Sequence, residues 1–548
     1  MLKKLLLPLL LASAFICNLE AQEVTFSTDF DGGSLAGYQL TDSVWFKRTA
    51  TDSVLMLSYD ITSRFDPDNP IDVTLPPSGR WFYFRMDNVK GKQLYLNFVN
   101  TDPLRCVYSY DNENFVRLTP CEGVERNKVN VTFEQNTVYL AYYTPYTYSH
   151  LQKRLAEWVN RYKPEPTDSV VIAIMSRMPH KGFVWLDTIG YSTQNRPIQM
   201  LTITDSDRDS YGKKKIWIHG RIHPSESPAS WHLDGFIDAL LTLTPETTEM
   251  LQNAVFYIVP FINPDGVANG LSRSNANGVN MEINWGRPDD STQLEVRVMK
   301  AKMQELAKDT AFDLFLNMHS QVANKASFWV HTAESTNGRF FQNEMRLAYL
   351  TCAHSSDYIA RKDLDYSALA SRYPEGWIWN SWGDKTMAIT FETPYTYYQN
   401  KPDSEWVTTE NLQEFGSQTL MAVSDYLNLC KYGRMIIDND NAKLRGDWET
   451  VTSTGVIYYG NSCVKPKKKG SKITYKKDIL GGNNYKVYAW YSGSYGNDDT
   501  YTNKWVYLQD YKQKKRGKFS LTLKVEELQF PNGEEVLYDA IMLVPYKE

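Results

Sequence analysis

Apolar and polar residues alternate with a period of two through the first part of the chain, from about residue 23 to residue 145. The clearest runs are RWFYFRMDN (80–88), KQLYLNFVN (92–100) and TVYLAYYTPYTYSH (137–150), and residues such as Gly, Asn, Asp and Pro separate them. Short alternating runs bounded by turn residues are typical of antiparallel strands in two packed sheets. This part of the chain is therefore predicted to form a β-sandwich.

A different pattern begins near residue 148, where an amphipathic helix is followed by strands and helices in alternation. The predicted strands are KKIWIHG (214–220), NAVFYIVPFINPDG (253–266), FDLFLNMHS (312–320) and TMAITFETPY (386–395). The predicted helices between them include SPASWHLDGFIDALLTL (227–243), with Pro in its first turn, and TQLEVRVMKAKMQELAKD (292–309). Such alternation indicates a mostly parallel sheet covered by helices.

The last part of the chain, from about residue 436, returns to strand-like alternation in NNYKVYAWYSGS (483–494) and KWVYLQDY (504–511). We interpret it as a separate sandwich. The expected organisation is thus a signal peptide at 1–21, an N-terminal β-sandwich at 22–147, a catalytic α/β domain at 148–435 and a C-terminal β-sandwich at 436–548. A chain of 548 residues is long enough for several such cores.

The N-terminus predicts where the protein acts. A basic MLKK is followed by the apolar run LLLPLLLASAFIC and the polar NLEAQ. This is the pattern of a secretory signal peptide, with cleavage expected between Ala21 and Gln22. No later segment holds about 18 uninterrupted apolar residues, so no membrane span is expected. The predicted location is secreted or periplasmic.

Composition narrows the classes of function. The chain is 42% hydrophobic and 22% charged with a net charge of −5, as in ordinary folded proteins. Its one basic run, KPKKKGSK at 465–472, has no basic face around it, so no nucleic-acid partner is expected. Five cysteines remain after the signal peptide, at positions 106, 121, 352, 430 and 463. Their spacing is not a disulfide framework, which leaves both a Cys106–Cys121 bridge and free thiols open.

Four residues at predicted strand ends suggest metal chemistry. His223 and Glu226 lie in one loop between a strand and a helix, and His319 ends another strand. Two imidazoles and a carboxylate are the protein ligands of a catalytic zinc, which keeps a fourth position for water. Glu392, at a further strand end, is placed to act as general base on that water. Arg273 is a candidate cation for stabilising a developing oxyanion.

A set of ordered motifs then resembles a known family. HPSE (223–226), NPDGVANGLSR (263–273), GVNMEINW (278–285), MHS (318–320) and FE (391–392) occur in the order found in funnelin-type zinc carboxypeptidases. The likeness is greatest to the cytosolic-carboxypeptidase branch, whose N-terminal sandwich the first domain resembles, and it spans roughly residues 25–430. It implies one zinc held by His223, Glu226 and His319, with Glu392 catalytic and Arg273 contacting the carbonyl oxygen. It also implies a central mixed sheet flanked by helices, here between an N-terminal and a C-terminal β-sandwich.

One segment departs from the family pattern. The family has Gly-x-Asp-x-Asn-Arg-x-Trp, in which Asp orients the first zinc histidine and Asn-Arg holds the C-terminal carboxylate of the substrate. Here Asn280, Glu282 and Ile283 occupy those three positions. Asn280 is still able to accept a hydrogen bond from His223, but as a neutral group. Glu282 would repel a carboxylate.

The departure leaves substrate recognition open. Arg287 or Arg372 could replace the missing cation, or the substrate could lack a free carboxylate and bring an amine to Glu282. Tyr373, in SRYPEGW, is the candidate for the tyrosine that contacts substrate in this family.

We therefore expect a secreted zinc metallopeptidase of carboxypeptidase type that acts on a peptide or a peptide-containing polymer. The alternatives are a zinc amidase acting on cell-wall stem peptides or glycopeptides, and a catalytically decayed binding protein. The C-terminal domain resembles golvesin-type or lyase-associated β modules through GDWETVTSTGVIYYGNS and DAIMLVPY. That resemblance implies contact with polysaccharide or with a cell surface.

Overall fold

The computed structural model describes residues 23–546 apart from short gaps at 50–51, 102–104, 124–126, 162–183, 206–211, 402–404, 431–433, 454, 480–482, 495–500 and 514–516. The predicted signal peptide lies outside the described residues. The chain forms two compact units. The first extends to Phe65 and resumes over Gly79–Pro145, and the second takes in Asp66–Ser78 and the chain from Tyr146 onward.

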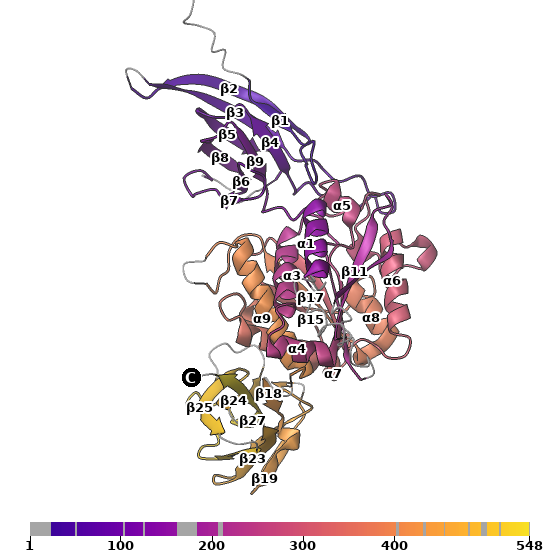
Figure 1. The fold of residues 1–548 in the computed structure, drawn as a ribbon, viewed down its shortest axis with the longest axis vertical. Coiled ribbons are helices and arrows are strands. Elements are labelled where there is room, and N and C mark those ends of the chain that lie inside the picture. Colours follow the sequence, from indigo (N-terminus) through magenta and orange to yellow (C-terminus); the bar gives the residue numbers. More distant parts are fainter. Residues whose placement is uncertain are drawn as a thin grey trace, which may run out of the picture. The chain divides into compact units, whose positions relative to one another are not determined.

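The first unit consists of two β-sheets (Figure 1). Five strands pair in the order β1-β4-β9-β6-β7 and four in the order β2-β3-β5-β8. The apolar core includes Phe84, Leu94, Leu96 and Leu140. The strands are β1 (Thr25–Ser27), β2 (Gly37–Lys47), β3 (Ser53–Thr62), β4 (Tyr83–Asp87), β5 (Lys92–Phe98), β6 (Val107–Ser109), β7 (Val116–Arg117), β8 (Lys128–Thr132) and β9 (Thr137–Ala141).

One strand pair differs from the antiparallel arrangement that the sequence predicts. β3 and β5 pair in parallel, with Leu57 opposite Leu94. Parallel neighbours require a long crossover, because the chain must return to the same end of the sheet. Here the connection contains β4, which joins the other sheet, and the excursion Asp66–Ser78 through the second unit.

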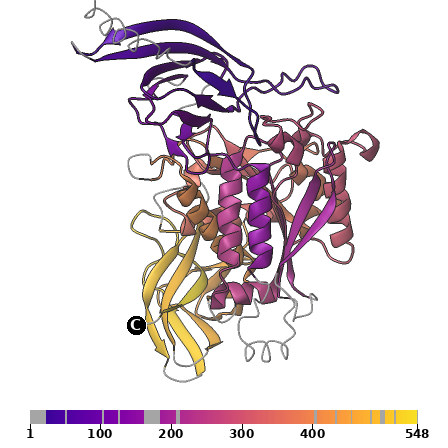
Figure 2. The ribbon, with the colours of Figure 1, turned by 45° about the horizontal axis from the view of Figure 1, so that its top comes forward.

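The central part of the second unit is an eight-stranded mixed sheet in the order β10-β11-β13-β12-β14-β17-β15-β16 (Figures 1 and 2). Its strands are β10 (Val184–Tyr191), β11 (Pro197–Ile203), β12 (Lys214–Gly220), β13 (Ala254–Val259), β14 (Leu314–Gln321), β15 (Ser327–His331), β16 (Asp365–Ser367) and β17 (Met387–Pro394). The helices are α1 (Tyr148–Asn160), α3 (Ser227–Leu240), α4 (Pro245–Asn253), α5 (Pro264–Ala268), α6 (Leu294–Leu306), α7 (Gly338–His354), α8 (Pro374–Trp382) and α9 (Thr409–Leu427). This confirms the predicted mixed sheet with flanking helices.

Helices cover both faces of this sheet. On one face, α6 and α8 pack against Trp217, Phe315 and Ala388 in a buried apolar cluster. Phe391 lies three residues beyond Ala388 on β17 and so points to the opposite face. There its ring contacts the rings of His232 on α3 and Phe415 on α9. The sheet is therefore buried on both sides, which leaves its edges for polar residues.

The C-terminal part of the second unit contains antiparallel sheets, as predicted. One includes the path β20-β22-β27-β24-β21, with β18 and β25 attached, and the other has the order β19-β23-β26. The strands are β18 (Met435–Ile437), β19 (Lys443–Arg445), β20 (Trp448–Val451), β21 (Val456–Ile457), β22 (Cys463–Pro466), β23 (Lys472–Ile479), β24 (Asn483–Ser494), β25 (Trp505–Gln513), β26 (Gly517–Lys524) and β27 (Leu537–Tyr546).

Two further observations bear on the expectations from the sequence. Cys106 and Cys121 are both free thiols, the first buried and the second exposed. Among the described residues, no helix combines the length and the apolarity that crossing a bilayer requires.

Candidate metal centre and active site

Parallel strands bring the candidate residues to one edge of the mixed sheet. β12 pairs in parallel with β13 and β14, and β14 pairs in parallel with β17. His319 lies near the end of β14, Glu392 near the end of β17, and the loop 221–226 follows β12. Since the carboxyl ends of parallel strands share an edge, residues far apart in the sequence meet there.

The loop after β12 is shaped by Arg221, a buried arginine with a φ of 54°. Its Nε donates to the carbonyl of Pro224 (3.0 Å), and its Nη1 donates to the carbonyl of Tyr146 and to Ser230 Oγ (both 3.0 Å). These bonds connect the loop to α3, whose first turn contains a proline. The loop thereby presents His223 and Glu226 toward the same point.

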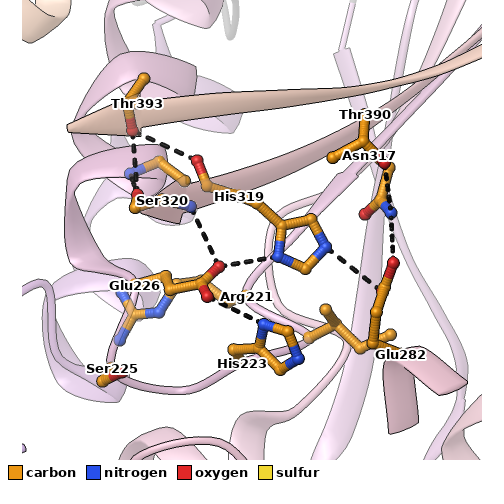
Figure 3. Close-up of polar contacts among 12 residues, drawn as sticks. Arg221, His223, Ser225, Glu226, Glu282, Asn317, His319, Ser320, Thr390 and Thr393 are labelled. Carbon is orange, nitrogen blue, oxygen red and sulfur yellow. Dashed lines mark hydrogen bonds and ion pairs between the residues drawn. The ribbon is translucent and has the colours of Figure 1, made fainter. Parts of the chain in front are cut away.

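The carboxylate of Glu226 lies between the rings of two histidines (Figure 3). Its Oε1 is 2.8 Å from His223 Nδ1, and its Oε2 is 2.8 Å from His319 Nδ1. The backbone N–H of Ser320 donates to Oε2 at 3.0 Å. His223, Glu226 and His319 are each only 3% exposed. The predicted ligand set is therefore assembled and buried.

This group fits a metal ion. One ligand atom from each of His223, Glu226 and His319 lies within 4.8 Å of the others. Two imidazole nitrogens and a carboxylate oxygen form the donor set of a catalytic zinc. Beside them, the buried Oε2 of Glu392 has no hydrogen-bond partner among the described residues. A cation and its bound water would satisfy that oxygen, so the residues present are suited to zinc.

The two histidines differ in their electrostatic surroundings. Burial lowers the pKa of His223 to about 4, with Glu226 opposing this shift and Arg273 adding to it. Burial also acts to lower the pKa of His319, but Glu282 and Glu226 outweigh burial and hold that pKa well above its ordinary value. Burial alone would raise the pKa of Glu226, yet the facing imidazoles hold it well below the usual range. The site therefore contains an ionised carboxylate.

Glu392 is part-buried on β17 with His319 directly opposite on β14. Burial raises the pKa of Glu392 to about 8, and the carboxylates of Glu226 and Glu282 add to the rise, while His319 and Arg273 oppose it. The positive charge of a metal would oppose the rise further. Glu392 thus has the position and the adjustable proton affinity of a general base.

Arg273 is exposed, and its charge acts on both His223 and Glu392. The loop that carries it is held by Asp66, a residue of the Asp66–Ser78 excursion. The Asp66 carboxylate accepts three consecutive backbone N–H groups, from Ser272 (2.6 Å), Arg273 (2.7 Å) and Ser274 (2.8 Å). Asp66 therefore fixes the backbone from which Arg273 extends.

The same excursion contacts the segment that departs from the family pattern. Gly278 has a φ of 79°, and a Cβ there would lie 2.3 Å from the carbonyl oxygen of Asp68. A larger residue would therefore be strained and would displace the excursion.

The departing segment lies against the two histidines. His223 Nε2 is 3.1 Å from Asn280 Oδ1. Glu282, in the 3₁₀ turn η1 (Met281–Ile283), is turned inward, with Oε2 3.2 Å from His319 Nε2. Its Oε1 accepts a hydrogen bond from Asn317 Nδ2 at 3.0 Å (Figure 3). Glu282 is only 6% exposed and lies beside the buried ring of His319.

Behind Glu282 lie two more buried carboxyl groups. Asn317 Nδ2 also donates to Glu375 Oε1 (3.0 Å), which accepts from Thr390 Oγ1 (2.6 Å) as well. Burial raises the pKa of Glu375, and Glu282 adds to the rise. Glu344 contacts His331 Nδ1 at 2.7 Å, and burial raises the pKa of Glu344 to about 7.

The remaining candidates lie at the surface. Arg287 and Arg372 are exposed, and Tyr373 is half-buried. The Arg372 guanidinium lies 5.0 Å from the centre of the Tyr373 ring. The carbonyl of Arg372 accepts from the backbone N–H of Trp285 at 3.1 Å, so this pair adjoins the departing segment.

Sequence reasoning did not identify Asn317, Glu375 or Asp66 as parts of the site. Asn317 had a usable signal, because it lies two residues before His319 on a strand and so shares its face. Glu375 follows Tyr373 by two residues but carries no motif. Asp66 is about 200 residues from the loop it binds, and nothing in the sequence connects them.

Comparisons with known proteins agree with this geometry. Residues 172–376 match the family described as zinc carboxypeptidase. Human cytosolic carboxypeptidase 6 is 26% identical over 333 residues, which are 56% of this chain and 61% of that protein. This chain thus spans somewhat less than two thirds of that relative's length.

Solved structures show the same fold. A metallo-carboxypeptidase from Burkholderia cenocepacia superposes with a TM-score of 0.57 at 20% identity, covering 74% of this chain and 99% of that chain. One from Pseudomonas aeruginosa, in complex with (2-guanidinoethylmercapto)succinic acid, has a TM-score of 0.56 at 21% identity, with 74% and 99% covered.

Residues 172–376 thus match the zinc carboxypeptidase family, and the histidine–glutamate–histidine set lies within that match. His223, Glu226 and His319 are the zinc-binding residues of this chain, which confirms the predicted ligands. The match ends at residue 376, before β17, so the role of Glu392 rests on its position beside His319.

Proposed function

We propose that the protein is an exported zinc peptidase that removes residues from the C-terminus of peptides or of peptide-containing polymers. The observation that carries this proposal is the buried histidine–glutamate–histidine set beside Glu392, whose Oε2 has no hydrogen-bond partner among the described residues. A complete ligand set with a base in place is not what a decayed binding protein would retain.

The chain's own residues divide the work of hydrolysis. Zinc, when bound, supplies Lewis-acid activation of water and of the scissile carbonyl. Glu392 takes the proton of the attacking water and returns it to the leaving amine. Arg273 provides a positive charge for the oxygen that becomes negative in the transition state. His223, Glu226 and His319 hold the centre in a buried pocket, where such charge interactions are strong.

The substrate's C-terminal carboxylate needs a cation other than the family's usual arginine, since Ile283 occupies that position. We propose Arg372, which is exposed, stacked on Tyr373 and adjacent to the departing segment. Arg287 is also exposed, but its charge acts on Asp72. Tyr373 would then contact the substrate beside Arg372.

The amidase alternative depends on a substrate amine reaching Glu282. Both oxygens of Glu282 face protein groups instead, Oε1 toward Asn317 and Oε2 toward His319. No observation therefore favours that alternative.

Export and the role of the C-terminal sheets complete the proposed function. The basic and apolar N-terminus supports export. Tyr507 on β25 and Tyr501 in the loop before β25 are exposed, which supports contact with a polysaccharide or a cell surface through stacking.

The direct test is to incubate zinc-loaded protein with peptides that end in a free carboxylate and with the same peptides ending in an amide, and to analyse products by mass spectrometry. We expect single residues to be released from the first set and about 10- to 100-fold slower release from the second, because a charge-assisted contact is lost. Equal rates would contradict carboxylate recognition. If fully zinc-loaded, folded protein cleaved neither set of peptides, the proposed peptidase activity would be contradicted.

A further inference from the structure

The two zinc-binding histidines have chemically different partners on the ring atom that does not face Glu226. His223 Nε2 lies 3.1 Å from the amide oxygen of Asn280, a neutral group. His319 Nε2 lies 3.2 Å from the carboxylate oxygen Oε2 of Glu282. Asn280 and Glu282 belong to the same short turn, two positions apart. One turn thus contacts both rings but places a carboxylate group beside only one of them.

Glu282 is held in this orientation from behind. Its Oε1 accepts from Asn317 Nδ2 at 3.0 Å. The other side of the Asn317 amide, Oδ1, lies 2.9 Å from His219 Nε2, and His219 Nδ1 accepts from Trp217 Nε1 at 3.1 Å. Because the indole N–H can only donate, His219 carries its proton on Nε2 and donates to Asn317. This chain of bonds directs the Asn317 N–H groups toward Glu282.

We propose that Glu282 is the positioning residue for the zinc ligand His319. Its carboxylate gives His319 the charged partner that His223 lacks, because His223 faces the neutral amide of Asn280. A carboxylate on the remote nitrogen of a zinc-ligating imidazole fixes the ring and raises its basicity. The proposal rests on the zinc site alone and not on the proposed peptidase activity.

The burial of Glu282 excludes a simpler role in substrate binding. The residue is 6% exposed; its Oε1 accepts a hydrogen bond from Asn317, and its Oε2 lies at ion-pair distance from His319 Nε2 without a hydrogen bond to any of the described residues. Glu282 therefore acts on the zinc site through His319, in addition to its charge effect on Glu392.

Zinc affinity provides the test. The Glu282→Gln variant keeps the shape and an acceptor oxygen but removes the charge. We expect its zinc dissociation constant, measured by competition with a chelator of known affinity, to rise about 10- to 100-fold, the usual effect of losing such a partner. The matched control is Glu344→Gln, since Glu344 is also a buried carboxyl group beside an imidazole, but its partner His331 is not one of the three zinc ligands. That variant should bind zinc within about twofold of the native protein.

A rescue experiment separates positioning from general damage. Adding Asn280→Asp to Glu282→Gln places the carboxylate on His223 instead, and zinc affinity should recover most of the loss. The visible spectrum of the cobalt(II)-loaded protein should change in Glu282→Gln and change again in the double variant, because it reports the ligand field directly.

Native zinc affinity in folded Glu282→Gln protein would overturn the proposal, as would a double variant that recovers nothing. If Glu282→Gln fails to fold, Glu282→Asp provides the same test, because it keeps the charge but draws it back from His319. An intermediate loss of affinity in Glu282→Asp would support the proposal, and native affinity would overturn it. Cleavage activity enters none of these measurements, so a failed peptidase assay and a failed affinity result remain distinguishable.

Discussion

His319 and Glu392 are directly opposite each other on the adjacent parallel strands β14 and β17. Neighbouring parallel strands lie about 4.8 Å apart, so the ladder itself sets the spacing between the metal ligand and the candidate base. Side chains at paired positions also point to the same side of the sheet. The general base is therefore positioned by regular backbone hydrogen bonds and not by a loop.

This relationship predicts distinct effects for the two residues. Glu392→Gln should retain zinc, because Glu392 is not one of the three residues whose ligand atoms cluster, yet lose at least about a hundredfold in kcat through loss of the base. Metal content and steady-state rates on the same preparation check this. Loss of zinc in this variant would instead make Glu392 a ligand.

His319→Ala should lose zinc, since only two protein ligands would remain. Elemental analysis after dialysis measures it, with one zinc per chain expected for the native protein. His354→Gln is the control, because His354 contacts Asp425 in another part of the unit and should leave zinc content unchanged. Native zinc content in the His319→Ala variant would contradict the ligand assignment.

Arg372→Ala should raise KM for peptides with a free C-terminal carboxylate by about 10- to 100-fold while changing kcat less, as expected for loss of a charge-assisted contact. Arg287→Ala serves as the matched control and should have a small effect. Peptides ending in an amide should not distinguish the variants. A larger effect from Arg287→Ala would reverse the assignment of the two arginines.

Stability should fall as pH rises through the range in which Glu344 titrates. Burial raises the pKa of Glu344 from 4.5 to about 7, so the folded protein binds the proton more tightly than the unfolded chain does. The free energy of unfolding from this group must then decrease between about pH 4.5 and pH 7. The pKa of His331 is raised against the opposing effect of burial by the Glu344 carboxylate, and its contribution is lost with rising pH too.

Glu344→Gln removes the titrating carboxyl and with it the cause of the raised pKa at His331. We expect urea-unfolding midpoints measured from pH 4.5 to pH 8 to fall less steeply in this variant than in the native protein. Other buried acids contribute to both proteins equally, so only the difference in slope is informative. Parallel curves would show that the pair does not titrate in this range.

Asp66→Asn should reduce activity without removing zinc, because its carboxylate accepts three backbone N–H groups around Arg273. A neutral amide oxygen accepts these bonds more weakly, and we expect kcat/KM to fall about tenfold. If Asp66 acts through Arg273, then Asp66→Asn should have little further effect in an Arg273→Ala background. Additive losses would indicate that Asp66 acts elsewhere.

The zinc ligands could be predicted from the sequence because residue type and short-range spacing identify them. His223 and Glu226 are three residues apart, and His319 ends a recognisable strand, so residue type and strand position were sufficient. The mixed sheet followed similarly from strand–helix alternation.

The orientation of Glu282 could not be predicted, since the sequence shows only that the family's carboxylate clamp is absent. The direction of that side chain depends on Asn317 and on burial, which are properties of the folded chain. The parallel pairing of β3 with β5 was missed because an alternating pattern fits either direction of pairing.

The excursion at Asp66–Ser78 also limits how this protein can be divided or recombined. The chain passes from one compact unit to the other after Phe65, again after Ser78 and again after Pro145. A single cut ahead of the catalytic region would therefore remove Asp66 together with the N-terminal strands. Replacing everything before Tyr146 by another domain joined at one point would leave the Arg273 loop without Asp66. A recombined protein would therefore have to retain the Asp66–Ser78 excursion.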